Sequence, residues 1–152
     1  SPIIMMLLES RLPIENIPVM VQKEAAQRLC AEVGSRESGA ITVAVNYYAE
    51  PEILFSVNKD SFLPPPKVDS AVIKLNVRKK PPVKVDNEKK FFALVKAAFA
   101  QRRKTFVNTV ANTTELSKDE IQNALLSLNL SPTVRSEQLK MEELAELSNI
   151  LK

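Results

Sequence analysis

Phe62 is the residue whose position most strongly suggests chemistry, because the prolines Pro64, Pro65 and Pro66 follow it almost at once. Consecutive prolines fix φ and remove backbone donors, so they predict a stiff, exposed and extended loop. A large aromatic ring presented by such a loop, beside a strand that begins at Ser70, is a platform for stacking a flat ligand such as a nucleobase. The alternative is that Phe62 is buried in the core beneath an ordinary proline-rich connector.

A second group that could do chemistry is the cationic run Arg102, Arg103 and Lys104. It ends a basic block, because residues 78–104 hold ten basic and two acidic side chains while the segments on either side are net acidic. The net charge of +3 conceals this asymmetry. A local basic footprint of this kind neutralises phosphates, although a solvated helix face also explains scattered lysines.

The elements around these cations decide between the two explanations. Apolar residues recur at helical spacing between residues 87 and 112 and form one stripe: Phe92, Val95, Phe99, Phe106 and Val110. In one continuous helix Arg103 points along the stripe toward the core, where a guanidinium needs a partner or a water-filled cleft. If the helix breaks near Gln101, a second helix begins beside the cations. Either geometry puts them at a junction where a phosphate can dock.

The composition excludes several other kinds of site. The chain has no histidine, the commonest general base and metal ligand. Its two glycines, Gly34 and Gly39, are too few for a glycine-rich turn around a phosphate or an adenosyl group. The one cysteine, Cys30, lies in a helical pattern as a small buried hydrophobe; it permits no internal disulfide, which suits a reducing cytosol. The apolar run at residues 2–8 is too short to span a membrane.

Periodicity and capping signals predict the remaining elements. Strands are expected at 17–22, 52–57 and 70–77, and helices at 2–10, 23–33, 88–112, 118–128 and 141–151. The strand at 17–22 is nearly all apolar, which is typical of a strand buried on both faces of a parallel sheet. Gly34 suits a left-handed helix cap, and Ser117 an N-cap. Residues 40–49 are ambiguous, because their β-branched side chains favour a strand while their apolar spacing allows a helix.

Two stretches of the chain resemble motifs of a known family. Phe62-Leu-Pro-Pro-Pro-Lys-Val-Asp-Ser-Ala-Val72 and Phe99-Ala-Gln-Arg-Arg-Lys-Thr105 are similar to motifs of the adenine dimethyltransferases of small-subunit ribosomal RNA. Weaker similarities extend over essentially the whole chain. Members of the family carry an upstream half with a glycine-rich S-adenosylmethionine loop and an Asn-Leu-Pro-Tyr catalytic motif, and neither is present in this sequence. The resemblance therefore implies the C-terminal part of such an enzyme.

The resemblance also implies a fold and a domain organisation. Residues 1–77 would be the last part of a Rossmann-like class I methyltransferase sheet, of the α/β class. Residues 78–87, with two prolines and several charges, would be a linker. Residues 88–152 would form a small all-helical RNA-binding domain. The family pattern makes residues 40–49 a helix.

The activity implied is the transfer of two methyl groups from S-adenosylmethionine to the exocyclic amine of each of two adjacent adenines. Those adenines lie in a hairpin loop near the 3′ end of small-subunit ribosomal RNA, so the partner is a 30S-type subunit and the compartment the cytoplasm. By motif position Phe62 stacks on the target adenine, and Pro64 and Pro65 shape its loop. Lys67 and the run 102–104 would hold the RNA backbone, which positions the target without reading its sequence.

Three alternatives remain at this stage. The methyltransferases that confer macrolide resistance on large-subunit RNA share the Phe-x-Pro loop, although the run Ala98–Thr105 favours the small-subunit family. The chain could also act as a non-catalytic RNA-binding or ribosome-assembly module. The third alternative is that the basic block is a solvated face without a ligand.

The absence of upstream strands leads to one further expectation. The strand at 17–22 would leave backbone N–H and C=O groups unpaired, and the apolar faces of Ile3, Met6 and Leu7 would meet water. A monomer tolerates such surfaces poorly. We therefore expect the chain to self-associate, through this sheet edge or by exchange of elements between copies.

Overall fold

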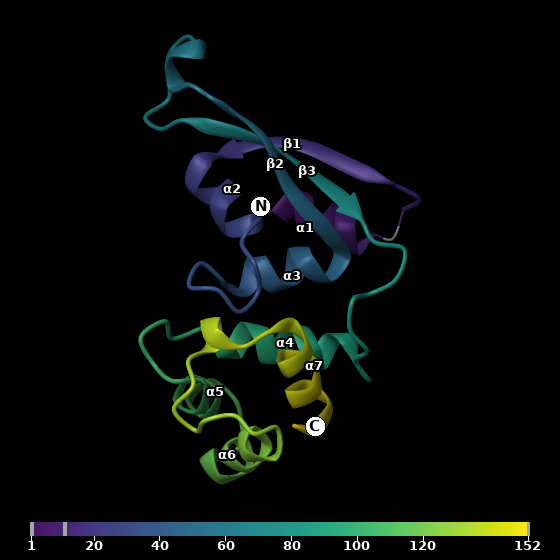
Figure 1. Cartoon of the computed structure of the whole chain (residues 1–152), viewed down its shortest axis with the longest axis vertical. Helices are drawn as coiled ribbons and strands as arrows, with labels where there is room; N and C mark the ends of the chain where they lie inside the picture. The colour runs from purple at the N-terminus through teal and green to yellow at the C-terminus, as the bar shows by residue number, and fades with distance from the viewer. Residues whose placement is uncertain (1, 11, 152) are drawn as a thin grey trace. The chain divides into compact units, whose positions relative to one another are not determined.

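The computed structural model describes residues 2–10 and 12–151. The chain divides into two compact units. The first consists of residues 1–31 and 44–82, and the second of residues 32–43 and 83–152. The first unit holds the sheet and the second holds the helices that follow it in the chain (Figure 1).

The sheet has three strands, β1 (Asn16–Gln22), β2 (Ala49–Val57) and β3 (Ser70–Val77), in the order β1-β3-β2. Both neighbours of β3 run antiparallel to it, and the register pairs Met20 with Val72 and Phe55 with Val72. Burial alternates along β3, because one face is fully packed and the other is half-buried. The strand at residues 70–77 is confirmed, and β2 begins three residues before the predicted start.

The prediction of a parallel strand buried on both faces at residues 17–22 is wrong. Within the described residues β1 pairs with β3 alone, in antiparallel orientation, and its burial alternates. Ile17 is buried while Met20, on the opposite face, is 52% exposed. A run of apolar residues thus cannot by itself distinguish a parallel core strand from an outer antiparallel one.

Three helices accompany the sheet: α1 (Pro2–Glu9), α2 (Lys23–Leu29) and α3 (Ala40–Tyr48). Helix α2 packs on all three strands, and its Ala26 and Leu29 are buried. The ambiguous stretch at 40–49 is helical, as the family pattern implied. Helix α2 is shorter than predicted, because it ends at Leu29, with Cys30 as its C-cap, instead of continuing to Val33.

Gly34 has the left-handed conformation that the sequence predicted, with φ of +97°, but it does not cap α2. A Cβ at this position would lie 3.3 Å from Cγ of Lys140, so the space around Gly34 within the second unit is tight as well.

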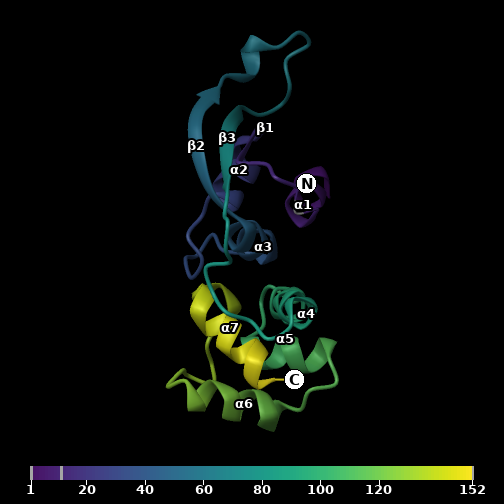
Figure 2. The ribbon, with the colours of Figure 1, turned by 90° about the vertical axis from the view of Figure 1, so that its right-hand side faces the viewer.

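Besides the first residues of α3, the described part of the second unit contains four α-helices: α4 (Glu88–Ala98), α5 (Phe106–Thr113), α6 (Lys118–Ser127) and α7 (Met141–Ile150). Helix α4 packs on α5 and α7, and α6 packs on the same two helices. Figure 2 shows these helices from a second direction. The predicted cap of α6 is confirmed, since Ser117 and Glu120 form a reciprocal capping box. The core is formed by fully buried side chains: Phe91, Phe106, Ile121, Leu125, Leu139, Leu144 and Leu147.

The stretch at residues 88–112 is two helices, so the alternative with a break near Gln101 is the correct one. Helix α4 ends at Ala98 and α5 begins after its N-cap residue Thr105. The predicted stripe also needs one correction, because Phe91 is fully buried whereas Phe92 is only half-buried.

In the part of the chain that the structure describes, every helix is too short or too polar to cross a membrane.

Candidate nucleic-acid interface

The proline-rich loop between β2 and β3 projects beyond the ends of the strands (Figures 1 and 2). It begins with a short 3₁₀ helix, Lys59–Ser61, which is capped by the side chain of Asn58 through a 2.8 Å bond from the Asp60 N–H. The Asp69 carboxylate accepts a 2.9 Å bond from the N–H of Lys59, which joins the two ends of the loop. The loop therefore has a closed base and an extended tip.

The five residues that matter at the tip differ in exposure. Phe62 has extended backbone and is half-buried, whereas Leu63 is 98% exposed. Pro64, Pro65 and Lys67 are exposed. The predicted loop residues thus lie together on one projecting loop, in which Phe62 is less exposed than its neighbour.

The cations Arg102, Arg103 and Lys104 lie in the turn that joins α4 and α5, and all three are exposed. Thr109 joins this turn to the end of α4. Its buried hydroxyl accepts from the N–H of Gln101 at 3.0 Å and donates to the carbonyl of Ala97 at 2.8 Å. We call residues 101–104 the cationic turn. Thr109 thus tethers the start of the cationic turn, and the three charged side chains are exposed to solvent together.

Two further contacts fix the same turn. The Asn112 side chain donates to Oε1 of Gln101 at 3.0 Å. The Arg135 guanidinium donates to the carbonyl of Arg103 at 3.3 Å. This second bond brings a fourth exposed cation to the cationic turn.

Arg135 was not selected by sequence reasoning as a candidate site residue. It lies 32 residues beyond Arg103 in the chain, within an acidic segment, and belongs to the short stretch Arg135–Leu139 that weakly resembles the family. That weak similarity was the only signal in the sequence that could have identified it. The N–H of Phe106 also bonds to the carbonyl of Val134, which brings the two segments together.

The loop tip and the cationic turn belong to different units of the chain. Phe62, Pro64, Pro65 and Lys67 form one group, and the three cations with Arg135 form the other. Each group presents the chemistry expected of a nucleic-acid contact: an aromatic and apolar tip in the first, and clustered permanent cations in the second.

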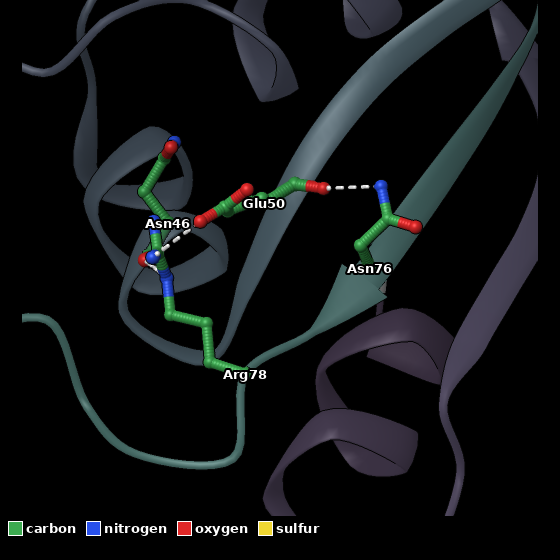
Figure 3. Close-up of polar contacts among 4 residues, drawn as sticks. All are labelled: Asn46, Glu50, Asn76 and Arg78. Atoms are coloured by element: carbon green, nitrogen blue, oxygen red, sulfur yellow. Dashed lines mark hydrogen bonds and ion pairs between the residues drawn. The ribbon is translucent and has the colours of Figure 1, made fainter.

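At the other end of the strands, Arg78 ties the end of β3 to the neighbouring elements (Figure 3). Its guanidinium donates to the carbonyl of Asn46 at 2.9 Å and to Oε1 of Glu50 at 3.0 Å. Asn76 in turn donates to the carbonyl of Glu50 at 3.2 Å. Arg78 also lines a cavity of about 690 Å³ together with Leu8, Tyr47 and Tyr48. This polar cluster anchors the chain where it leaves the sheet.

Two further kinds of reactive group can be assessed in the part of the chain that is described. Burial, with a smaller contribution from the Glu52 carboxylate, raises the pKa of the Cys30 thiol, so the thiol is neutral at neutral pH and a poor nucleophile. Within the same residues, acidic side chains and the cysteine form no cluster that could hold a metal ion.

Comparisons with known proteins agree with these features. A family model described as ribosomal RNA adenine dimethylase matches residues 1–152. Ribosomal RNA small subunit methyltransferase A of Geobacillus sp. (strain WCH70) is 47% identical over 154 residues, which cover 99% of this chain and 53% of that protein. The chain therefore spans about half the length of the curated relatives it matches, and it corresponds to their C-terminal portion.

Solved structures show the same fold. A dimethyladenosine transferase from Plasmodium falciparum matches with a TM-score of 0.76 and 25% identity, over 97% of this chain and 61% of that one. The 23S rRNA methyltransferase ErmE matches with a TM-score of 0.67 and 21% identity, over 98% of this chain and 59% of that one, which bears on the fold alone. The fold is mixed α/β and methyltransferase-like, and the family model covers the whole sequence. The chain belongs to the ribosomal RNA adenine dimethylase family.

Proposed function

We propose that this chain is the target-binding portion of an S-adenosylmethionine-dependent enzyme that dimethylates two adjacent adenines in small-subunit ribosomal RNA. In this proposal residues 1–77 are the last part of a class I methyltransferase sheet, residues 78–87 a linker, and residues 88–152 an RNA-binding helical domain. The partner is a hairpin loop of a 30S-type subunit, and the compartment is the cytoplasm. Family membership and the presentation of the two groups of site residues support it.

The observation that carries the proposal is the cationic turn. Arg102, Arg103 and Lys104 are exposed on a backbone that Thr109 and Arg135 hold in place. Rigid presentation lowers the entropy lost when each cation meets a phosphate. Arg135 adds a fourth charge to the same surface. Such contacts fix the register of the RNA without reading its bases.

The proline-rich loop supplies the other half of the function. Phe62 stacks on the target adenine after the adenine has left the RNA hairpin loop. Pro64 and Pro65 restrict the backbone of the protein loop that carries Phe62. Lys67, exposed on the same loop, contacts the phosphate beside that base. Methylation of an exocyclic amine requires the lone pair to be aimed at the methyl carbon, so the positioning of the base contributes much of the rate.

S-adenosylmethionine supplies the methyl group in this reaction, but the residues of this chain do not fit it. A phosphate- or adenosyl-binding turn needs open glycine backbone. Gly34 is instead packed against Lys140, and the N–H of Gly39 is engaged by the Thr42 hydroxyl at 3.0 Å. We therefore assign the cofactor to the upstream half of the full-length enzyme and assign no part of its binding to these residues.

The test is the salt dependence of RNA binding. The probe is an RNA hairpin whose loop contains two adjacent adenines, titrated into the 152-residue chain at several salt concentrations. Substituting Gln for Arg102, Arg103 and Lys104 together should weaken binding and flatten the plot of log affinity against log salt by about 0.7–0.9 per lost contact.

A charge-matched pair of single substitutions sharpens this test. Arg103→Gln and Lys118→Gln each remove one exposed positive charge, but Lys118 lies in the first turn of α6, outside the cationic turn. Only Arg103→Gln should reduce the salt slope by the full amount. Equal effects of the two substitutions, or an affinity that does not respond to salt, would show that the basic block is only a solvated face.

One alternative function has an observation in its favour. The chain spans about half of its relatives and carries no glycine-rich turn, as expected of a non-catalytic RNA-binding or ribosome-assembly module. Calorimetric titration of the full-length protein with S-adenosylmethionine separates the two functions. Binding of S-adenosylmethionine supports the enzyme, and the absence of binding supports the non-catalytic module. Assays on isolated small and large subunits distinguish small-subunit methylation from the large-subunit reaction of the macrolide-resistance enzymes.

A further inference from the structure

Leu63 is the most exposed large apolar side chain in the part of the structure that is described. It is 98% exposed, whereas Ile3, the next in order, is 69% exposed and Phe55 is 56% exposed. An isolated exposed leucine on a mobile surface is unremarkable. Leu63 is different, because it lies in a loop whose two ends are joined by a bond between Lys59 and Asp69.

Several contacts limit the freedom of this loop to fold back over Leu63. Asp69 accepts from the N–H of Lys59 through its side chain and from the N–H of Lys23 through its carbonyl, both at 2.9 Å. Pro64, immediately after Leu63, has a fixed φ, and the next two prolines extend the stiff segment. The Leu63 side chain is therefore left exposed to solvent.

The backbone geometry separates Leu63 from its neighbour Phe62. Phe62 has φ of −113° and ψ of 154°, an extended conformation in which successive side chains point in roughly opposite directions. Phe62 is accordingly half-buried while Leu63 is fully exposed. The pair thus combines a half-buried aromatic ring with an almost fully exposed aliphatic side chain. Two different surfaces of a ligand can therefore be contacted from one loop.

We propose that Leu63 is a wedge that enters the RNA loop at the step from which the target adenine departs. This inference rests on the function proposed above and specifies a further residue for it. Removing a base from a stack leaves two neighbouring bases with exposed faces, and aliphatic side chains are used by nucleic-acid-binding proteins to fill such steps. A leucine side chain forms no hydrogen bond, so its contact with the unstacked bases does not depend on their sequence. Phe62 holds the extruded base, and Leu63 keeps the gap from closing.

The charges around the tip suit this role. Lys59 and Lys67 are exposed at the two ends of the same loop, so phosphates on either side of the step can be neutralised. Of the two acidic groups of the loop, the Asp69 carboxylate accepts from the N–H of Lys59, and Asp60 lies exposed in the 3₁₀ helix.

The experiment uses the 152-residue chain and a hairpin RNA with two adjacent loop adenines, in which 2-aminopurine replaces the base next to the target. Unstacking of that base raises its fluorescence. Wild-type chain should raise the fluorescence on binding. Leu63→Ser should abolish most of this rise and weaken hairpin binding about tenfold, because the apolar contact is lost. Leu63→Met should retain both.

Two controls separate a wedge from a general contact. Val68→Ala removes apolar surface from the same loop, where Val68 is 39% exposed, and should leave the fluorescence rise unchanged. A linear RNA of the loop sequence, which has little stacking to disrupt, should lose much less affinity with Leu63→Ser than the hairpin does. Equal losses on the two RNAs would overturn the wedge.

Other outcomes separate the wedge from the proposed function itself. If wild-type chain binds the hairpin with steep salt dependence and Leu63→Ser behaves like wild type, the wedge is wrong and the RNA-binding function stands. If wild-type chain does not bind the hairpin at any salt concentration, both fail. Thermal unfolding should be unchanged by Leu63→Ser, since the side chain has little contact to lose; a lowered Tm would instead show that Leu63 is a packing residue.

Discussion

At the scale of single residues, exposure and conformation assign different parts to neighbouring side chains. Phe62 and Leu63 are consecutive, but one is half-buried and the other is almost entirely in water. Arg103 and Arg135 are far apart in the chain, but a bond from one guanidinium to the other residue's carbonyl makes them neighbours. Both observations identify single side chains that can be substituted to remove one function while the fold is kept.

Phe62→Ala is expected to weaken engagement of the extruded adenine in the full-length enzyme by about 1–3 kcal/mol, the usual contribution of a base–aromatic stack. Phe62→Tyr and Phe62→Trp should keep most of the activity, because they keep a flat ring. The measurement is the rate of methyl transfer at limiting RNA, together with the affinity for S-adenosylmethionine, which should be nearly unchanged. A wild-type rate for Phe62→Ala would mean that the ring only packs the loop.

At the scale of elements, the turn between α4 and α5 depends on one buried hydroxyl. Thr109 is fully buried, and its side chain bonds to both Gln101 and Ala97 across the turn. Thr105 caps the start of α5 by accepting from the N–H of Asn108. The helix break and the presentation of the cations are thus parts of one arrangement.

Thr109→Val keeps the shape of this side chain but removes its hydroxyl, which leaves the N–H of Gln101 and the carbonyl of Ala97 without that partner. We expect a loss of about 1–3 kcal/mol in the free energy of unfolding, measured by urea denaturation, and faster hydrogen exchange at the Gln101 amide. Thr113→Val is the control, because Thr113 is exposed and bonds only to the preceding turn of its own helix. It should change stability by less than about 0.5 kcal/mol. Equal stability of the two variants would show that the hydroxyl does not hold the turn.

At the scale of the whole molecule, the sheet has an open side. Among the described residues β1 has a single strand partner, and Met20 and Phe55 lie exposed on one face, both in register with Val72. An outer strand with exposed apolar side chains favours pairing with another chain.

We therefore predict that the 152-residue chain self-associates at micromolar concentration, as light scattering would measure. Met20→Lys places a charge on β1 and should shift the population toward a monomer of about 17 kDa. Leu126→Lys is matched to it in chemistry and exposure, because Leu126 is 55% exposed on α6, in the other unit, and it should have no such effect. A wild-type chain that is monomeric, with protected amides in β1, would contradict the prediction.

A further prediction at this scale concerns catalysis. The 152-residue chain alone should transfer no radiolabelled methyl groups from S-adenosylmethionine to unmethylated small subunits, because its sequence holds neither a glycine-rich loop nor an Asn-Leu-Pro-Tyr motif. The full-length enzyme is the positive control in the same assay. Transfer by the chain alone would mean that its own residues form a cofactor site that we have not identified.

Much of the local structure follows from the sequence by itself. Alternating residues at 70–77 predict a strand, and Ser117 with Glu120 predicts the start of α6; the structure has both. These features depend on residues within one or two turns of each other, so the nearby sequence contains the physics that decides them. The two motifs at 62–72 and 99–105 likewise identified the family before any fold was available.

Only the tertiary structure decided how these pieces are used. The orientation of β1, which was predicted wrongly, is set by its pairing with β3, some 50 residues later in the chain. The break after α4 depends on Thr109 bonding back to Ala97, and the fourth cation reaches the turn only through its bond to Arg103. The loop that carries Phe62 and Leu63 is closed by the bond between Asp69 and Lys59, ten residues earlier in the chain. Each outcome rests on hydrogen bonds between residues that are distant in the chain, and local periodicity carries no information about such bonds.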